Sequence, residues 1–531
     1  MPISHPKPTF DTWSFRDPCQ GLTSWTAESP IALKAGSHYS ATAEPELPDL
    51  VFVCHFLSSS LASDVKAIDD ELGGALGKFL EESDNSNGSP NAGYESMSPT
   101  LRIVGGKKAT RYVLVGLNDG EGVESTGYAL GKAIASRCIE EASPQVEKAA
   151  LYIPSKMFLN EVFRDFTSAF YSSLYVDNRF RGTLTSIKKV KIPAEHLKSL
   201  SIEYYLESDT AATLDKESHD FLQNYDEGLA ISKGVILARD IVNAPHNIMN
   251  SLALAHVAKR ICDESGGSLT CKILGEEECE ARGMGAYLGV ARASETPPQF
   301  IHITYKPVQK EGDTTSPTKV GIVGKGLLFD TGGYNIKTAM MELMKFDCGG
   351  AAAVLGAAQT VGALKPPGVE CHFVVAACEN MINDKGIVPS DVLVASNGVS
   401  IEVLNTDAEG RLTLADALVY CDKELGCEKI IELSTLTGAC MVALGKVCMP
   451  SGYMFSKLTA NIWFLNPKQK SFFVFSHTLL AFFDLFPIPL FQSINVCAGS
   501  LWCLHGKRRI GERTRRSFED YRRTVMEAAT N

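Results

Sequence analysis

The stretch NTDAEGRLTLADAL, residues 405–418, sets two carboxylates two residues apart and places an arginine two residues further on. In an extended backbone alternate side chains share one face, so we expect Asp407, Glu409 and Arg411 to point the same way. A helix is predicted directly after them, over Leu412–Glu424. Taken alone, these three residues also fit a solvated cluster of ion pairs.

A second charged segment, VGKGLLFDTGGYNIK at residues 323–337, follows a strand predicted over Lys319–Gly324. It sets Lys325 and Asp330 among four glycines, where the backbone can approach a ligand closely. A glycine-rich turn also occurs in phosphate-binding loops. This segment fits neither GxxxxGK(S/T) nor a complete GxGxxG, so phosphate binding is the weaker interpretation.

Lys337 ends this segment, and Asp347 stands just before the predicted start of a helix at Gly349. Carboxylates gathered in one cleft raise one another's pKa strongly, so such a cluster needs cations. Two divalent ions, Mn²⁺, Zn²⁺ or Mg²⁺, fit an oxygen-rich ligand set. Lys325 can join them as a neutral amine only if burial beside two cations depresses its pKa. The four acidic residues are Asp330, Asp347, Asp407 and Glu409.

Strand-like and helical stretches alternate over residues 226–445, which predicts a mostly parallel or mixed sheet covered by helices. Ligands of such sheets gather at the carboxyl ends of the strands. Strands are expected at Pro298–Tyr305, Lys319–Gly324, Val369–Ala377 and Lys429–Ser434, and a helix at Gly349–Leu364.

The chain of 531 residues is too long for one ordinary core, and residues 49–206 carry their own alternation of short apolar and amphipathic stretches. We therefore expect an α/β protein in which a smaller α/β N-terminal domain precedes a larger C-terminal catalytic domain, whose mixed sheet is flanked by helices. The expected divisions are a poorly ordered N-terminal extension (1–48), the N-terminal domain (49–225), the catalytic domain without its C-terminal part (226–456) and an aromatic and basic tail (457–531).

Composition narrows the class of protein. With 45% apolar and 21% charged residues the chain has the balance of a soluble globular protein, and its net charge of −11 argues against nucleic-acid binding. Only the basic run over 507–523 would support a DNA-binding duty. Fifteen cysteines without a CxxC pair indicate reduced intracellular thiols.

Residues 1–20 lack the pattern of a secretory signal peptide, so we expect a cytoplasmic protein. The Ser-, Thr- and Pro-rich first 48 residues leave a plastid or other organelle open, although acidic residues there are unusual for an import sequence. The apolar run Ser471–Phe491 has about the length that a bilayer needs, roughly 20 residues, but it contains Asp484, Pro487 and Pro489. No membrane association is therefore expected.

The two charged segments resemble the metal-binding motifs of the leucyl aminopeptidases, peptidase family M17. NTDAEGRLTLADAL is similar to the family's signature, and VGKGLLFDTGGYNIK is similar to its other metal-binding motif. Further similarity covers residues 238–250, 342–358, 378–392 and 434–445, and extends weakly through 49–225.

The resemblance implies a site and a reaction. Lys325, Asp330, Asp347, Asp407 and Glu409 would hold two divalent ions, with Asp330 and Glu409 bridging both. Lys337 would polarise the scissile carbonyl, and Arg411 would hold a bicarbonate that acts as general base on the attacking water. The first side-chain pocket would be lined by Met344, Thr435 and Gly438.

The implied function is a metalloaminopeptidase that removes leucine-like N-terminal residues from short peptides or amino-acid amides, in a protein that forms a homo-hexamer. Requiring the substrate's free amine as a metal ligand makes such an enzyme an exopeptidase. Its metals would lower the pKa of a water and offset charge on the tetrahedral intermediate.

Two departures from the family open an alternative. Residues 338–346 form a shorter loop than in many relatives, which would displace Lys337. The resemblance also stops at residues 450–456, and the tail over 457–531 has no counterpart. A catalytically impaired family member that serves as an interaction or scaffolding subunit is therefore the second hypothesis.

Overall fold

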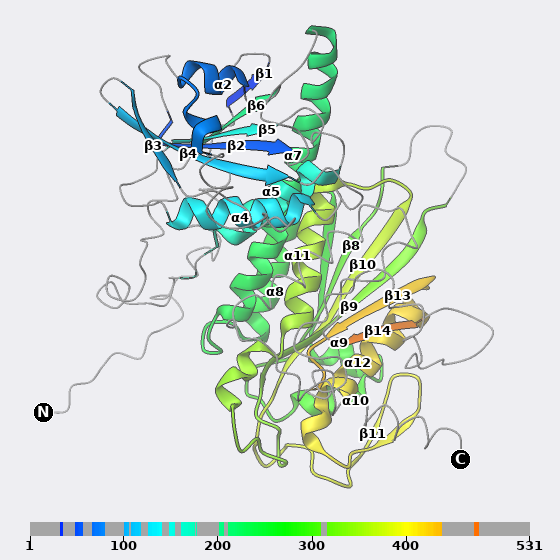
Figure 1. The fold of residues 1–531 in the computed structure, drawn as a ribbon. Helices are drawn as coiled ribbons and strands as arrows, with labels where there is room; N and C mark the ends of the chain where they lie inside the picture. Colours follow the sequence, from blue (N-terminus) through cyan, green and yellow to red (C-terminus); the bar gives the residue numbers. More distant parts are fainter. Residues whose placement is uncertain are drawn as a thin grey trace, which may run out of the picture.

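The computed structural model describes residues 32–35, 48–56, 66–79, 100–105, 108–117, 126–140, 148–153, 161–175, 177, 201–206, 211–308, 316–437 and 472–476. Within these ranges the chain forms two six-stranded sheets and a two-stranded hairpin, with helices packed on both large sheets (Figure 1).

The first sheet has the strand order β1-β6-β5-β2-β4-β3, and its neighbours pair in parallel except for β3 and β4. Residues Leu50–Cys54 of the central strand β2 form an unbroken apolar run, because both faces of the strand are covered. Leu50, Phe52 and Cys54 pack with residues of α4 and α5, while Val51 and Val53 pack with Ile68 on the other face. The elements are β1 (Ala32–Ala35), β2 (Leu50–Phe56), α2 (Lys66–Glu71), β3 (Leu101–Gly105), β4 (Lys108–Leu117), α4 (Thr126–Glu140), β5 (Lys148–Ile153), α5 (Glu161–Ser173) and β6 (Ser201–Leu206).

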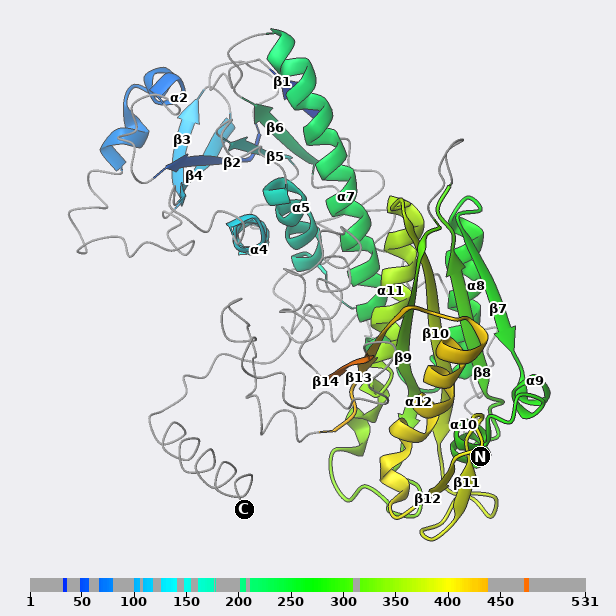
Figure 2. The same cartoon turned by 90° about the vertical axis from the view of Figure 1, so that its right-hand side faces the viewer.

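A single long helix, α7 (Ala211–Asn243), runs from the first sheet to the second and packs against α5 in one and α11 in the other (Figures 1 and 2). Its contact with α11 is close, because a Cβ on Gly234 would lie 2.4 Å from the carbonyl oxygen of Gly356. The helix begins at Ala211 and continues to Asn243. The domain boundary predicted at 225/226 therefore falls inside a continuous helix.

The second sheet has the order β14-β13-β9-β10-β8-β7. The strands from β14 to β10 pair in parallel, and β8 and β7 add an antiparallel edge, so the sheet is mixed as predicted. Helices α8 and α11 cover one face, and α10 and α12 cover the other (Figure 2). The elements are α8 (Ser251–Glu264), β7 (Leu269–Leu274), α9 (Glu276–Glu280), α10 (Gly285–Ala291), β8 (Gln299–Tyr305), β9 (Thr318–Asp330), η4 (Met341–Phe346), α11 (Gly349–Leu364), β10 (Val369–Asn380), β11 (Val392–Val394), β12 (Ser400–Glu402), η5 (Thr406–Ala408), α12 (Glu409–Val419), η6 (Tyr420–Glu424), β13 (Lys429–Ser434) and β14 (Phe472–Ser476).

The predicted elements of the larger domain agree with the structure. Helix α11 and strand β13 have the predicted bounds, and β8 begins one residue after its predicted start. Strands β9 and β10 contain the predicted strands and continue beyond their predicted carboxyl ends, to Asp330 and Asn380. No disulfide joins any of the cysteines that the structure describes.

Most of the predicted N-terminal extension and tail lies outside the described residues. Within the tail, Phe472–Ser476 forms β14, which pairs in parallel with β13 at the edge of the second sheet. Among the helices of the described ranges, none has the length and apolar character to cross a membrane.

A chain of hydrogen bonds is buried between this sheet and the end of α12. His302 on β8 lies 3.0 Å, nitrogen to nitrogen, from His372 on β10, and its other ring nitrogen lies 3.2 Å from the hydroxyl of Tyr420. His372 also lies 3.2 Å from the Glu370 carboxylate. These contacts fix the helix that carries Glu409 onto the sheet.

We predict that His302 makes the fold acid-sensitive. Burial, together with the charges of His372 and Lys272, lowers the pKa of His302 from 6.5 to about 4. Between these values the unfolded chain binds the proton and the folded chain does not, so stability is present above pH 6.5 and is lost as the pH falls toward 4. We expect a loss of about 2 kcal/mol between pH 8 and pH 5 from this group.

Urea unfolding at both pH values measures this loss. His302→Gln removes the titrating ring, so its unfolding free energy should change less between the two pH values than that of the unchanged chain. An equal change in both proteins would contradict the prediction.

Candidate metal centre

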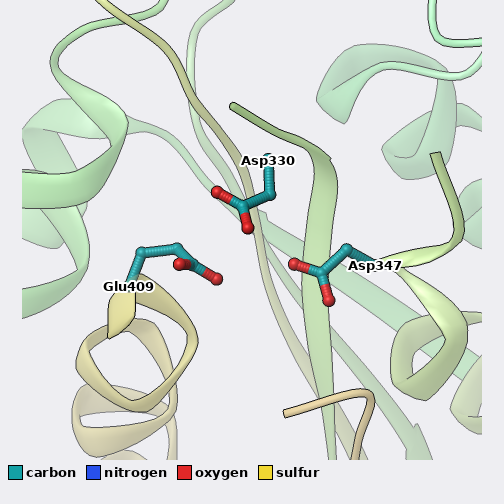
Figure 3. Close-up of side chains that lie close together, drawn as sticks. All are labelled: Asp330, Asp347 and Glu409. Carbon is teal, nitrogen blue, oxygen red and sulfur yellow. The ribbon is translucent and has the colours of Figure 1, made fainter. Parts of the chain in front are cut away.

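Three buried carboxylates converge at the carboxyl ends of the central strands. Asp330 ends β9, Asp347 lies between η4 and α11, and Glu409 is the first residue of α12. One oxygen of each lies within 4.8 Å of the others, and the three side chains point into a common space (Figure 3). Segments 321–350 and 401–416, far apart in the sequence, therefore meet at one place.

Close packing brings Asp347 to this edge. A Cβ on Gly350 would lie 2.0 Å from the carbonyl oxygen of Leu433, and one on Gly324 would lie 2.7 Å from the carbonyl oxygen of Gly350. Only glycine allows the start of α11 to approach β9 and β13 this closely. Because Asp347 precedes that start, it is held over the sheet edge.

Lys325 lies among these carboxylates. Its Nζ is 2.8 Å from Oδ2 of Asp347 and 3.0 Å from Oε1 of Glu409, and the side chain is 3% exposed. Burial by itself lowers the pKa of Lys325, but the two carboxylates outweigh burial and raise it. A neutral Lys325 therefore requires cations that offset both carboxylates, and its depressed pKa stays a prediction.

The carboxyls respond in the opposite direction. Burial raises the pKa of Asp347 to about 6 and that of Glu409 to about 7, in spite of the nearby ammonium. One lysine is thus not enough to keep these groups fully ionised near neutral pH.

The predicted extended backbone at 405–411 is wrong. Residues Thr406–Ala408 form a 3-10 turn, and α12 begins at Glu409. The turn starts at Asn405, whose side-chain oxygen accepts a hydrogen bond from the backbone amide of Asp407. The three charged side chains consequently separate: Glu409 is buried, Asp407 is partly exposed and Arg411 is exposed. The burial of Glu409 also excludes the solvated ion-pair cluster.

Lys337 joins the two segments at the rim. Its Nζ lies 2.8 Å from Oδ2 of Asp330 and 2.5 Å from Oδ1 of Asp407. Burial lowers the pKa of Lys337, but its hydrogen bonds to these carboxylates raise it overall, so the side chain is a cation. Asp407 is therefore connected to Asp330 by the ammonium of Lys337, and it lies outside the close group of three carboxylates.

Comparison with known proteins agrees with this geometry. Residues 236–460 match the model of the cytosol aminopeptidase family, catalytic domain. The chain is 43% identical to leucine aminopeptidase 1 of Arabidopsis thaliana over 386 residues, which cover 71% of this chain and 68% of that protein. It is 42% identical to a probable cytosol aminopeptidase of Synechococcus, over 73% of this chain and 71% of that protein.

The chain belongs to the cytosol aminopeptidase family. The predicted family and fold class are confirmed by these matches. With chloroplastic leucine aminopeptidase 2 of Arabidopsis thaliana the chain shares 43% identity, but the match spans 61% of that protein. A solved structure of a tomato leucine aminopeptidase mutant superposes with a TM-score of 0.62 at 36% identity, covering 78% of this chain and 76% of that one.

Of the remaining predicted site residues, the structure describes three. Thr435 donates its hydroxyl to Oδ1 of Asp347 at 2.8 Å, so it fixes a predicted metal ligand. Met344 is partly buried in η4, and Arg411 makes no ion pair within the described ranges. Gly438 lies outside the described residues.

Sequence reasoning missed the polar residues that join the two segments. Thr406 donates its hydroxyl to the carbonyl oxygen of Gly332 at 2.6 Å, and its amide donates to Oδ1 of Asn335 at 2.9 Å. Asn380, from a third segment, contacts both sides. All three residues lie in stretches similar to the family, but their spacing along the chain gives no sign of these contacts.

The residues present fit the binding of a divalent cation. The group offers oxygen ligands from Asp330, Asp347 and Glu409, with Lys325 and Asp407 adjacent. Oε2 of Glu409 is buried without a hydrogen-bond partner in the described part of the chain, a costly arrangement that a cation would relieve. Oxygen donors of this kind suit Mn²⁺, Mg²⁺ and Zn²⁺.

We predict that Gly410→Ala separates fold from metal binding. Alanine ordinarily stabilises a helix by about 1 kcal/mol relative to glycine. At Gly410, however, a Cβ would lie 2.5 Å from Cε and 2.7 Å from Nζ of Lys325. The lysine end is flexible, so we expect the fold to persist while the amine shifts, with Mn²⁺ affinity and activity falling about 100-fold.

Calorimetric Mn²⁺ titration and thermal unfolding measure the two effects. Ala415→Gly in the same helix is the matched control: it should lower stability by about 1 kcal/mol and leave Mn²⁺ affinity unchanged. Wild-type affinity in Gly410→Ala would count against a functional position for Lys325.

Proposed function

We propose that this chain is a metal-dependent leucyl-type aminopeptidase that removes leucine-like N-terminal residues from short peptides and amino-acid amides. The observation that carries the proposal is the convergence of Asp330, Asp347 and Glu409 around Lys325. Two relatives named leucine aminopeptidases, each 43% identical to this chain over more than 70% of its length, support this reaction.

The proposed division of labour follows from position. Lys325, Asp330, Asp347, Asp407 and Glu409 hold the metals, which when bound supply a water of lowered pKa and attract the substrate's free amine. Lys337 is a cation at the rim and stabilises negative charge that develops on the scissile carbonyl oxygen. Arg411 is exposed at the start of α12, two residues from Glu409, where it can hold bicarbonate as the general base.

The metals and the first pocket belong to the proposal as well. We expect two ions per subunit, Mn²⁺ or Zn²⁺ with Mg²⁺ as the further option, since all three accept carboxylate oxygens. Met344, Thr435 and Gly438 would line the pocket for the leucine-like side chain. Thr435 would then serve both Asp347 and the substrate.

A homo-hexamer is the proposed assembly. Large apolar side chains are exposed in the loops that follow β9 and β10 and on the β11–β12 hairpin, where exposed apolar area is costly in a monomer. They include Tyr334, Ile336, Val392, Val394, Val399 and Leu404.

For the compartment we propose the cytoplasm, with the plastid as the alternative. Relatives with similar identity are named as cytosol aminopeptidases in cyanobacteria and as chloroplastic enzymes in plants. A fusion of residues 1–48 to a fluorescent protein would decide between the two compartments.

An impaired subunit that acts as an interaction or scaffolding partner is the second candidate. The family match ends at residue 460, and residues 472–476 supply the edge strand next to β13. Metals bound without turnover would favour this alternative.

We predict that the chain hydrolyses leucine amide in the presence of Mn²⁺ and that Glu409→Gln lowers the rate at least about 100-fold, since it removes a buried ligand charge. The control is Glu402→Gln, which changes an exposed glutamate on β12 and should leave the rate unchanged. Loss of leucine amide hydrolysis in both variants, or its absence in the unchanged chain at full metal occupancy, would contradict the proposed function.

A further inference from the structure

The side-chain amide of Asn380 lies between the two ligand-bearing segments. Its Nδ2 donates to Oδ1 of Asp330 at 2.8 Å and to the backbone oxygen of Thr406 at 3.1 Å. Asp330 belongs to the first segment, and Thr406 directly precedes Asp407 in the second. One buried amide thus contacts both halves of the site, and Asn380 itself is 1% exposed.

A shift in the register between β9 and β10 places Asn380 beside Asp330. Along β9 and β10 the pairing runs one to one as far as Leu327 and Cys378, and then shifts so that Asn380 pairs with Asp330. Three residues of β9 therefore oppose two of β10, which is a β-bulge. Bulges re-aim side chains beside active sites, and here the extra residue of β9 brings Asp330 opposite Asn380.

The chemistry of the neighbours fixes which end of the amide faces them. A carboxylate oxygen and a backbone carbonyl oxygen both accept hydrogen bonds and cannot donate. The atom between them must therefore be the NH₂ group, whose two hydrogens are both used.

The contact with Asp330 decides how that carboxylate is presented. Its Oδ1 accepts from both Asn380 and the amide of Gly332, at 2.8 and 2.9 Å. Its Oδ2 is left to Lys337. A neutral amide can hold one oxygen in this way without cancelling the carboxylate charge, whereas a lysine would compete with a cation for it.

Asn380 also ties the turn at 331–335 to the second segment. Its backbone oxygen accepts both the amide and the hydroxyl of Thr331, at 3.0 and 2.9 Å. Thr406, on the other side, bonds to Gly332 and Asn335. Removing the Asn380 amide would leave the Thr406 carbonyl oxygen without this buried donor and release one oxygen of Asp330.

We propose that Asn380 is a positioning residue, which sets Asp330 at the distance from the Asp407–Glu409 segment that the metal pair requires. The inference rests on the proposed metallopeptidase function and gives that site a further determinant outside its ligands. Neighbouring hydrogen-bond partners of ligands commonly change metal affinity or activity by about 10- to 100-fold.

The test compares two asparagines of the same stretch in the full chain. Asn380→Ala removes the amide described above. Asn383→Ala is the matched control, because the side chain of Asn383 also makes two hydrogen bonds, to the oxygen of Ala293 and from the amide of Lys385, each at 2.8 Å, and neither partner is a predicted ligand. Mn²⁺ affinity is measured by calorimetry after the metal has been stripped.

We expect Asn380→Ala to weaken Mn²⁺ binding about 10- to 100-fold and Asn383→Ala to change it less than about 3-fold. At saturating Mn²⁺, kcat for leucine amide should fall in Asn380→Ala, with KM within about 3-fold of the unchanged chain, because the substrate-binding groups are intact. Equal Mn²⁺ affinities in the two variants would overturn the proposal.

A milder variant covers the case in which Asn380→Ala fails to fold. Asn380→Ser keeps a polar group but lacks the forked NH₂, so a folded Asn380→Ser protein with wild-type Mn²⁺ affinity would also overturn the proposal. If the unchanged chain binds Mn²⁺ without hydrolysing leucine amide, the proposed function fails while the affinity comparison still decides the role of Asn380.

Discussion

Mutual repulsion between buried carboxylates is the constraint on which the catalytic domain depends. Asp330, Asp347 and Glu409 are at most 6% exposed and each offers an oxygen within 4.8 Å of the others, so each charge loses much of its hydration. Lys325 offsets part of this cost, yet the pKa of Glu409 still rises to about 7. Such a group stays assembled only if the surrounding fold holds it and cations complete the charge balance.

The sheet and its two covering layers supply that hold. Parallel strands β13, β9 and β10 are neighbours in the middle of the sheet, and β9 and β10 carry Lys325, Asp330 and Asn380. The glycine- and alanine-rich α11 then lies close enough to the sheet to bring Asp347 to this edge, and α12 brings Glu409 from the other face. The predicted ligands come from three places in the sequence, and backbone packing holds them at this edge.

Helix α7 extends this support beyond the catalytic sheet. It packs on α5 of the N-terminal domain and on α11, and Lys345 of η4 donates to the carbonyl oxygen of Asn243 at its last turn, at 2.9 Å. Because η4 ends one residue before Asp347, this hydrogen bond connects the end of α7 to the segment that carries a predicted metal ligand. A cation at a helix C-terminus is also favoured by the helix dipole. One continuous helix therefore packs against elements of both sheets and ends beside the segment that carries Asp347.

The sequence by itself determined the residue types, the family and most elements of the larger sheet. Two motifs with glycine, lysine and carboxylates predicted that residues 323–337 and 405–411 form one metal site, because acidic residues are rarely gathered without a cation. The period of the apolar residues predicted α11 and β13 with their observed bounds. These features depend on the residue types within short segments, which can be seen directly in the sequence.

Only the tertiary structure decided how the site is assembled. Residues Thr406–Ala408 form a turn where extended backbone was expected. As a result Glu409 is buried, whereas Asp407 pairs with Lys337. The role of Asn380 depends on a register shift between β9 and β10, which no pattern in either strand reveals. Hydrogen bonds and charge contacts between distant segments follow from the three-dimensional path of the backbone, and a difference of one residue in that path changes which groups meet.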